Sequence, residues 1–269
     1  MSPYPWDWLP LVLFTLGTVG GCARRPPPLT AQDIGRIFHR HHVTGCFVLH
    51  DVQRGTTLRY NPSRARRRML PASTFKIPHA LIAVETGVIR DARQVIRWNG
   101  KKYAFAAWNR DQTLASAIRF SVVWAFQWIA RQIGRARMQQ WIDRLGYGNR
   151  DVSGPLDGFW LEAGHLAISA DEQVAFLRRL QAGTVPFSKR TQALVREALV
   201  VKRTPTYVLR AKTGWAIRKT HQHGWYVGWV ERGSRAWVFA MNMDGRFRVN
   251  REARITITQA VLRRAGALP

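Results

Sequence analysis

The sequence predicts an α/β fold of the α+β type: an antiparallel sheet built from both ends of the chain, flanked by helices, with a mainly helical subdomain inserted. Two observations lead to this fold class. Segments rich in β-branched and aromatic residues lie near both ends of the 269-residue chain. Between them, from residue 73 to about 180, apolar residues recur every three or four positions, as in helices. Helices that cover a sheet assembled from the two ends satisfy both patterns.

The N-terminal part of the fold is predicted to hold one helix and one hairpin. Residues 30–41 form an amphipathic pattern that Thr30 would cap. Residues 46–51 and 57–60 follow as two short strands, with Gly55 in the turn between them. These strands supply the N-terminal part of the sheet.

The C-terminal part is predicted to supply the other strands and a closing helix. The strand candidates are residues 207–211, 224–231 and 236–242. Residues 232–234, Arg-Gly-Ser, form the turn between the last two. An amphipathic helix over residues 252–264 would then pack on the sheet.

The first 29 residues resemble an export segment rather than part of the fold. An apolar run over residues 9–19 is followed by small residues, so residues 1–23 are interpreted as a signal peptide and residues 24–29 as a Pro-rich linker. The run is shorter than the roughly 20 residues of a membrane span. A single domain would occupy residues 30–269, and the protein would be exported. Val-Gly-Gly-Cys ending at Cys22 also matches a lipoprotein cleavage box, so a lipid anchor at Cys22 is the alternative.

Cysteine and histidine usage argues against disulfide or metal chemistry. After cleavage only Cys46 remains inside the domain, in an apolar stretch where a buried thiol is expected. His39, His41 and His42 have no acidic or Cys partners nearby in the sequence, which favours an exposed helix end over a metal site.

The charge of the chain is strongly positive and has two interpretations. There are 42 Lys and Arg residues against 16 Asp and Glu, a formal net charge of +26. The bases are mostly Arg and are scattered, and no finger, helix-turn-helix or aromatic RNA-binding signature accompanies them. We therefore expect a solvated basic surface and no nucleic-acid partner; nucleic-acid binding is the alternative, which a steep salt dependence would reveal.

Two sequence motifs carry candidate chemistry. Ser73-Thr74-Phe75-Lys76 begins a predicted helix, where residues three apart share a face, so the Ser73 hydroxyl and the Lys76 amine can approach each other as nucleophile and base. Lys212-Thr213-Gly214 lies at the end of a strand-like segment, and this K-T-G element is the second motif of the penicillin-recognising serine acyltransferases. On an edge strand it offers a cation and a hydroxyl to a substrate carboxylate.

Three further motifs lie between these two in the order of one known family. They are Ser121-Val122-Val123, Tyr147-Gly148-Asn149 and Phe159-Trp160-Leu161-Glu162. The five ordered motifs resemble those of the class D, or oxacillinase-type, serine β-lactamases, and they span nearly all of the predicted domain. The resemblance implies the penicillin-recognising serine β-lactamase fold and hydrolysis of β-lactam antibiotics, a reaction that confers resistance.

The resemblance also implies roles for the catalytic residues. Ser73 would attack the β-lactam and form an acyl-enzyme, and Lys76 would react with CO2 to become N6-carboxylysine, the general base. No other cofactor is implied. The reaction with CO2 needs a neutral amine, so the Lys76 pKa must fall from about 10.4, as burial allows. Trp160 would donate a hydrogen bond to the carbamate, and Ser121 would relay protons between Ser73 and Lys212.

The remaining expected residues bind substrate or shape the site. Backbone N–H groups of Ser73 and Trp215 would form the oxyanion hole. Val123 and Leu161 would supply apolar walls, and Trp108 would stand at the rim. An Arg near the last helix would bind the substrate carboxylate; Arg251 fits best by distance along the chain. Its competitors are Arg246, Arg248 and Arg254.

Two other functions share this motif set. A β-lactam sensor domain has the same motifs but stays acylated, and such domains follow several membrane spans, which are not seen in this sequence. A cell-wall transpeptidase would carry Ser-x-Asn in place of Ser121-Val122-Val123. Small-molecule β-lactams are therefore the expected partners.

Overall fold

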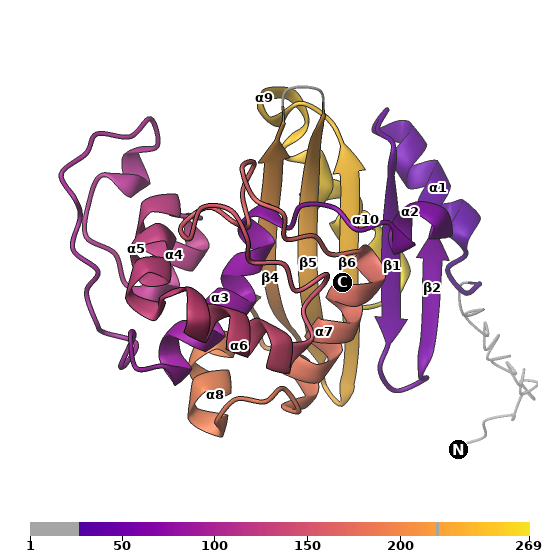
Figure 1. Ribbon diagram of the computed structural model, residues 1–269. Coiled ribbons are helices and arrows are strands. Elements are labelled where there is room, and N and C mark those ends of the chain that lie inside the picture. The colour runs from indigo at the N-terminus through magenta and orange to yellow at the C-terminus, as the bar shows by residue number, and fades with distance from the viewer. Residues whose placement is uncertain (1–26, 219–220) are drawn as a thin grey trace, which may run out of the picture.

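The described residues form a six-stranded antiparallel sheet with the strand order β2-β1-β6-β5-β4-β3 (Figure 1). This computed structural model describes residues 27–218 and 221–269. The predicted signal peptide, Cys22 and the first residues of the linker lie outside them. The strands are β1 (Gly45–Asp51), β2 (Thr56–Tyr60), β3 (Val200–Arg203), β4 (Val208–Ile217), β5 (Gln222–Arg232) and β6 (Arg235–Asp244).

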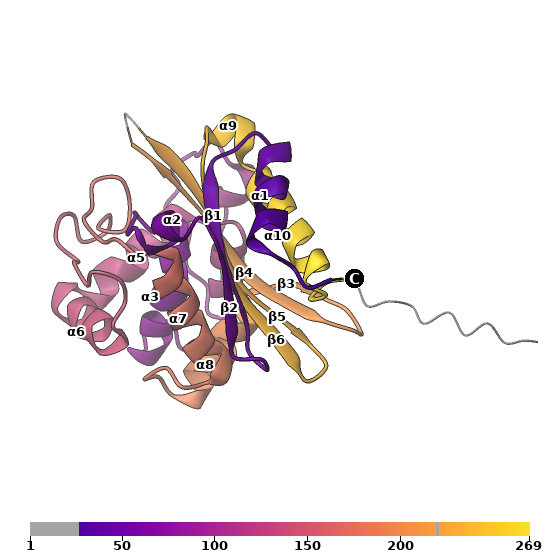
Figure 2. The ribbon, with the colours of Figure 1, turned by 90° about the vertical axis from the view of Figure 1, so that its right-hand side faces the viewer.

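Helices cover both faces of the sheet, which confirms the predicted fold class. The helices are α1 (Ala31–Arg40), α2 (Pro62–Arg66), η1 (Ala72–Phe75), α3 (Lys76–Glu85), η2 (Ala106–Trp108), α4 (Leu114–Arg119), α5 (Val123–Ile133), α6 (Arg135–Leu145), α7 (Ala170–Ala182), α8 (Lys189–Ala198), α9 (Phe247–Asn250) and α10 (Ala253–Arg264). Seen along the sheet, α1 and α10 lie on one face, and α2, α3 and α5 to α8 lie on the other (Figure 2). The segment between β2 and β3 is therefore the inserted helical part.

Strand β6 shows how one sheet serves two cores. Its Val238 and Ala240 belong to the large core under α3 to α8, whereas Phe239 and Met241 belong to the core under α1 and α10. Successive side chains of a strand point to opposite faces, so a strand covered on both sides must be apolar throughout. This explains why β6 reads as an apolar run rather than as an alternating pattern.

The N-terminal predictions are confirmed with small changes of boundary. Thr30 caps α1 in a capping box with Asp33, whose carboxylate accepts from the Thr30 backbone N–H at 2.9 Å. The predicted hairpin is β1 paired with β2, and Cys46 is buried in β1.

Strand β4 is longer than predicted, and this corrects the place of the K-T-G element. Lys212 to Gly214 lie within β4 and not at its end, and they pair with β5. Strand β3, which the sequence analysis missed, pairs only with positions 208–210 of β4. Beyond position 210, the side of β4 away from β5 is left without a strand partner among the described residues, so the K-T-G half is an edge, as expected.

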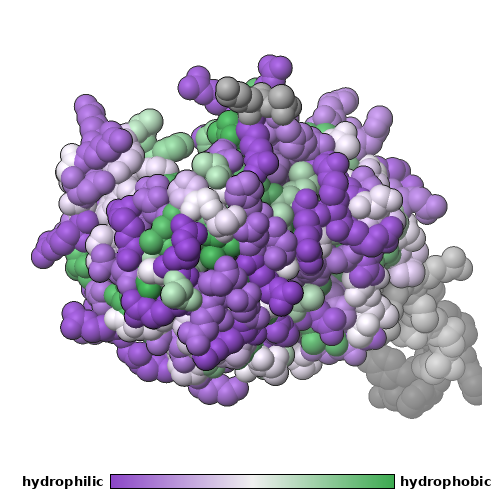
Figure 3. Space-filling view, viewed as in Figure 1, coloured by the Kyte–Doolittle hydropathy of each residue, from purple (hydrophilic) through white to green (hydrophobic). Residues whose placement is uncertain are grey.

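Hydrophilic residues cover most of the molecular face in Figure 3, with a hydrophobic area in its left half. This agrees with the basic composition of the chain. Within residues 27–218 and 221–269, no helix has the length and apolarity that crossing a membrane requires.

Candidate active site

Ser73 lies on a 3-10 turn, and Lys76 begins the α-helix that continues it. The turn is η1 and the helix is α3. Side chains three positions apart eclipse one another in a 3-10 turn. The Lys76 ammonium nitrogen Nζ accordingly donates to Ser73 Oγ at 2.9 Å. The predicted approach of these two side chains is confirmed, although the Ser lies one turn before the α-helix.

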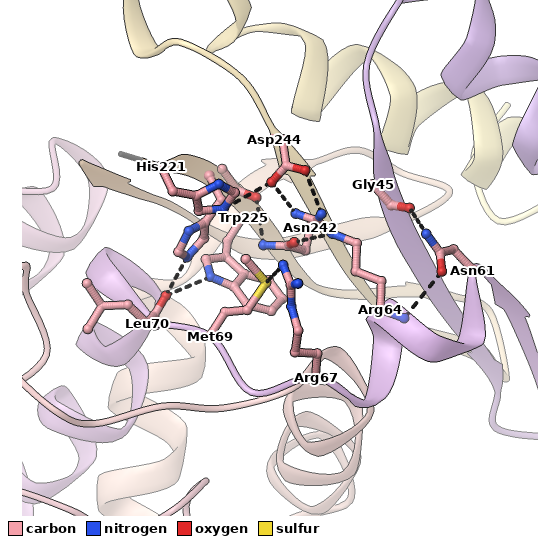
Figure 4. Close-up of polar contacts among 12 residues, drawn as sticks. Gly45, Asn61, Arg64, Arg67, Met69, Leu70, His221, Trp225, Asn242 and Asp244 are labelled. Carbon is pink, nitrogen blue, oxygen red and sulfur yellow. Dashed lines mark hydrogen bonds and ion pairs between the residues drawn. The ribbon is translucent and has the colours of Figure 1, made fainter. Parts of the chain in front are cut away.

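The segment that leads into η1 is fastened on two sides. The carbonyl oxygen of Leu70 accepts from Trp225 Nε1 and from His223 Nε2, both at 2.9 Å, as drawn in Figure 4. Met69 forms a two-bond bridge with Ile168, at 3.0 and 2.9 Å. The sheet and the loop before α7 thus hold the chain just ahead of Ser73, which fixes the position of the η1 turn.

The Lys76 amine lies in a fully buried, largely aromatic environment. Its side chain has no exposed surface, and Nζ lies 5.2 Å from the centroid of the Phe126 ring. Burial disfavours the charged form and lowers the Lys76 pKa to about 7. The neutral amine that reaction with CO2 requires is therefore available near neutral pH.

Trp160 lies next to this environment with its polar atom unused. The residue is fully buried and stacks on Phe75 with ring centroids 5.7 Å apart. Its indole Nε1 has no hydrogen-bond partner among the described residues. A buried donor without an acceptor is rare, so the indole points to a group that accepts a hydrogen bond there.

The loop that carries Trp160 is tied to the end of β4. Glu162 accepts from the backbone N–H of Ile217 at 3.0 Å, and Arg218 donates to the carbonyl of Gly164 at 3.0 Å. Leu161 packs, partly buried, against the large core. The Trp160 loop and the K-T-G strand therefore form one wall.

A second Lys–Ser pair lies in the same region. Lys212 Nζ donates to Ser121 Oγ at 2.6 Å and to the carbonyl of Thr213 at 2.9 Å. Burial, followed by the charges of Lys76 and Arg254, holds the Lys212 pKa well below its usual range. Ser121 has φ 56°, a left-handed conformation that non-glycine residues adopt at a cost. Such strain between α4 and α5 is typical of a functional turn.

Gly214 lets β4 approach the Ser73 turn. A Cβ added to Gly214 would lie 3.0 Å from both the Pro71 carbonyl oxygen and Thr74 Cγ2. The absence of a side chain therefore brings the K-T-G strand against η1. Trp215 follows on β4, partly exposed, and Thr213 is partly exposed too.

Arg254, and not Arg251, contacts the K-T-G strand. The Arg254 guanidinium is buried, donates to the Gly214 carbonyl at 2.6 Å and lies 5.2 Å from the Trp215 ring centroid. Its Nε has no partner among the described residues. The Arg251 side chain is half exposed, with Glu252 at 3.3 Å. Distance along the chain favoured Arg251, but the pitch of α10 turns Arg254 toward the sheet.

Trp108 and Val123 lie on the side of the site formed by η2 and α5. The indole of Trp108 donates to the carbonyl of Phe120, the residue before Ser121, at 2.9 Å. Val123 begins α5 and is partly exposed. Neither side chain offers reactive chemistry.

Sequence reasoning missed His79, a buried residue of this region. It lies one helical turn after Lys76, and its ring contacts Phe75, Phe126 and Trp160. Its spacing from Lys76 was the available signal, because residues three apart on a helix share a face.

A nucleophilic hydroxyl next to a buried amine, with a second Lys–Ser pair beside it, defines a serine acyl-transfer site. The family model of the penicillin binding protein transpeptidase domain matches residues 45–265. β-Lactamase OXA-48 of Klebsiella pneumoniae is 42% identical over 86% of this chain and 87% of its own length. β-Lactamase OXA-5 of Pseudomonas aeruginosa is 45% identical over 77% of this chain and 78% of its own length.

Solved structures agree with these relatives. The class D β-lactamase YbXI from Nostoc has a TM-score of 0.85 and 40% identity, and covers 88% of this chain and 99% of that chain. FUS-1 (OXA-85) from Fusobacterium nucleatum subsp. polymorphum has a TM-score of 0.86 and 33% identity, and covers 90% of this chain and 100% of that chain. The chain belongs to the class D serine β-lactamases. The resemblance drawn from five motifs is confirmed.

Proposed function

We propose that this enzyme hydrolyses the β-lactam ring of penicillin-type antibiotics through an acyl-enzyme on Ser73, with N-carboxylated Lys76 as the general base, and that it thereby confers resistance. The observation that carries this proposal is the Lys76 amine. It is fully buried, 2.9 Å from Ser73 Oγ, and has a pKa of about 7. A buried amine that is partly neutral at physiological pH is poised for base chemistry.

The first step is acylation. Ser73 Oγ attacks the β-lactam carbonyl carbon, the C–N bond of the ring breaks, and the ring nitrogen takes up a proton. The backbone N–H groups of Ser73 and Trp215 stabilise the oxyanion that develops. The close packing of Gly214 on the Ser73 turn supports this pair, because it brings the two backbones together.

Lys76 is the residue that would carry the carbamate, and its neighbours fit this group. The indole N–H of buried Trp160, which has no acceptor among the residues that the structure describes, supplies a donor to an anionic oxygen, and aromatic rings exclude water. When present, the carbamate supplies a base that takes the proton of Ser73 and later that of the hydrolytic water. Val123 and Leu161 are the apolar residues that would restrict water access.

Ser121 and Lys212 would return the proton. Because Lys212 Nζ donates to Ser121 Oγ, the Ser121 O–H is free to donate to the leaving ring nitrogen. The Thr213 hydroxyl and the Arg254 guanidinium would bind the substrate carboxylate. Arg254 is buried and its Nε has no partner in the described part of the chain, which supports its choice over Arg251. Trp108 would stand at the rim.

We also propose export of the enzyme to the bacterial periplasm, with residues 30–269 as the catalytic domain and a lipid anchor at Cys22 as the alternative to a cleaved signal peptide. The apolar run over residues 9–19 supports export. Mass spectrometry of the mature protein from cells distinguishes a lipidated Cys22 from a free N-terminus.

Turnover of a chromogenic cephalosporin, with and without added bicarbonate, tests the proposed hydrolysis. We expect multiple turnovers that bicarbonate sustains. A single stoichiometric burst that then stops would show a β-lactam sensor instead. The variant Ser73→Ala should form no covalent penicillin adduct by mass spectrometry, because it lacks the attacking oxygen. An adduct on that variant would overturn the nucleophile assignment.

A further inference from the structure

His79 is a fully buried histidine that the proposed chemistry leaves unused. Its ring is enclosed by three aromatic rings, with centroids 5.3 Å from Phe75, 5.2 Å from Phe126 and 5.1 Å from Trp160. Neither Nδ1 nor Nε2 has a hydrogen-bond partner among the described residues. A buried imidazole normally satisfies at least one nitrogen, so this environment calls for a polar group.

The position of His79 links it to Lys76. The two residues are three apart on α3, so their side chains share a face of the helix. Both approach Phe126: the Lys76 Nζ lies 5.2 Å from the ring centroid, and the His79 ring also lies 5.2 Å from it. Burial, followed by the Lys76 charge, lowers the His79 pKa to about 3. The imidazole is therefore neutral, with one N–H donor and one acceptor nitrogen.

The buried aromatic environment near Lys76 holds two donor groups that lack acceptors among the described residues. Within residues 27–218 and 221–269, the Trp160 indole is a donor without a partner, and one nitrogen of His79 is another. The carboxylate of Glu162, in the same loop as Trp160, is exposed and accepts from the backbone of Ile217. A group with two acceptor oxygens on the Lys76 nitrogen would satisfy both the indole and the imidazole.

We propose that His79 is a positioning residue for carboxylated Lys76, whose neutral imidazole donates a hydrogen bond, directly or through one buried water, to a carbamate oxygen and so slows the loss of CO2. This inference rests on the proposed function. In carboxylation the lone pair of the neutral amine forms the N–C bond to CO2. One C=O bonding pair becomes the carboxylate charge, and an N–H proton leaves to water.

The test measures CO2 binding rather than activity alone. Wild-type protein and the variants His79→Asn and His79→Leu are titrated with 13C-labelled bicarbonate, and the carbamate signal is followed by NMR. We expect His79→Leu, which has no donor, to need at least tenfold more CO2 for half occupancy. The Asn side chain keeps a donor, so His79→Asn should stay within about threefold of wild type. His50→Asn is the matched control, because His50 is a buried histidine of β1 that bonds Thr57.

Steady-state kinetics add a second readout. Penicillin turnover by His79→Leu should slow during the reaction and recover with excess bicarbonate, because decarboxylation outpaces recapture of CO2. An unchanged CO2 titration in a folded His79→Leu protein overturns the role of His79 while leaving the proposed function intact. The complete absence of a carbamate signal in wild type overturns the general base, and the His79 role with it.

A measurement on the wild-type protein keeps the proposal testable if His79→Leu does not fold. In 15N-histidine-labelled enzyme, one ring nitrogen of His79 should shift when CO2 is added, because it becomes a hydrogen-bond donor to an anion. The spectrum of His79→Asn assigns the signal. A His79 signal that stays constant while the carbamate forms overturns the inference.

Discussion

At the scale of single residues, burial decides what the titratable side chains can do. Lys76 and Lys212 are both buried, and both have lowered pKa values. Each of these lysines donates to a partly exposed serine: Lys76 to Ser73 and Lys212 to Ser121. A lysine amine of lowered pKa next to a hydroxyl group is an arrangement that can activate a serine without a histidine base.

The choice between Arg254 and Arg251 yields a prediction at this scale. Arg254→Ala should raise KM for penicillins at least tenfold, because the buried guanidinium beside Gly214 would otherwise bind the substrate carboxylate. Arg251→Ala, which removes a half-exposed side chain, should change KM less than twofold. Steady-state kinetics on a penicillin and its methyl ester check this. A similar loss with the ester, which lacks the charge, would contradict the role of Arg254.

At the scale of elements, the site is built where three segments meet. The η1 turn carries Ser73, the turn between α4 and α5 carries Ser121, and β4 carries Lys212. The Leu70 carbonyl accepts a hydrogen bond from Trp225 of β5, and Gly214 allows β4 to pack on η1. None of these contacts is local in sequence, so the geometry depends on the sheet.

A graded substitution at Gly214 tests this packing. In Gly214→Ala the new Cβ would lie 3.0 Å from the Pro71 carbonyl, so η1 must shift by a few tenths of an ångström. We expect acylation to slow about tenfold. Gly214→Val should slow it about a hundredfold, because misplacement of a reacting group by ~1 Å costs about this much. Stopped-flow acylation rates and the melting temperature check the prediction. Equal rates in the two variants would argue against close packing.

At the scale of the whole molecule, the Arg residues do more than coat the surface. Within the dense run after β2, Arg64 bonds both carboxylate oxygens of Asp244 at 2.6 Å and Asn242 at 2.8 Å, which joins α2 to β6 (Figure 4). Arg68 bonds Glu172 of α7. Others tie loops by donating to backbone carbonyls, as Arg135 does to Gly154 at 2.6 Å. The planar guanidinium fork suits such contacts better than an ammonium does.

The buried Lys76 should also make global stability depend on pH. Its pKa is about 7 in the folded enzyme, against an ordinary 10.5 in the unfolded chain. Between these values the unfolded chain binds more protons, so the free energy of unfolding rises with pH through this window. Below pH 7 Lys76 is charged in the folded enzyme as well, so the free energy of unfolding carries the full cost of burying that charge. Lys76→Met should therefore be more stable than wild type by about 2–4 kcal/mol at pH 6 in CO2-free buffer.

Urea unfolding at several pH values measures this effect. The stability gap between Lys76→Met and wild type should shrink as pH rises toward 10. Lys102→Met, at an exposed position, is the control and should show no such gap. A difference in the free energy of unfolding that stays constant with pH would show that burial does not destabilise the charged form of Lys76 in the folded enzyme.

The sequence by itself determined the fold class, the family and most of the residues that meet at the candidate site. Apolar periodicity and Thr30 located α1, and spacing alone predicted that Ser73 and Lys76 would meet, because residues three apart share a helix face. Motif order supplied Ser121 and Trp160. These features are local, so they are readable along the chain.

Only the tertiary structure decided what depends on contacts between distant segments. It turned Arg254 rather than Arg251 toward the K-T-G strand, and it extended β4 beyond Gly214 because β5 pairs with its full length. It also enclosed His79 and Trp160 in one buried environment around Lys76. Burial and pKa arise from the summed packing of many elements, and no local pattern in a sequence records that sum.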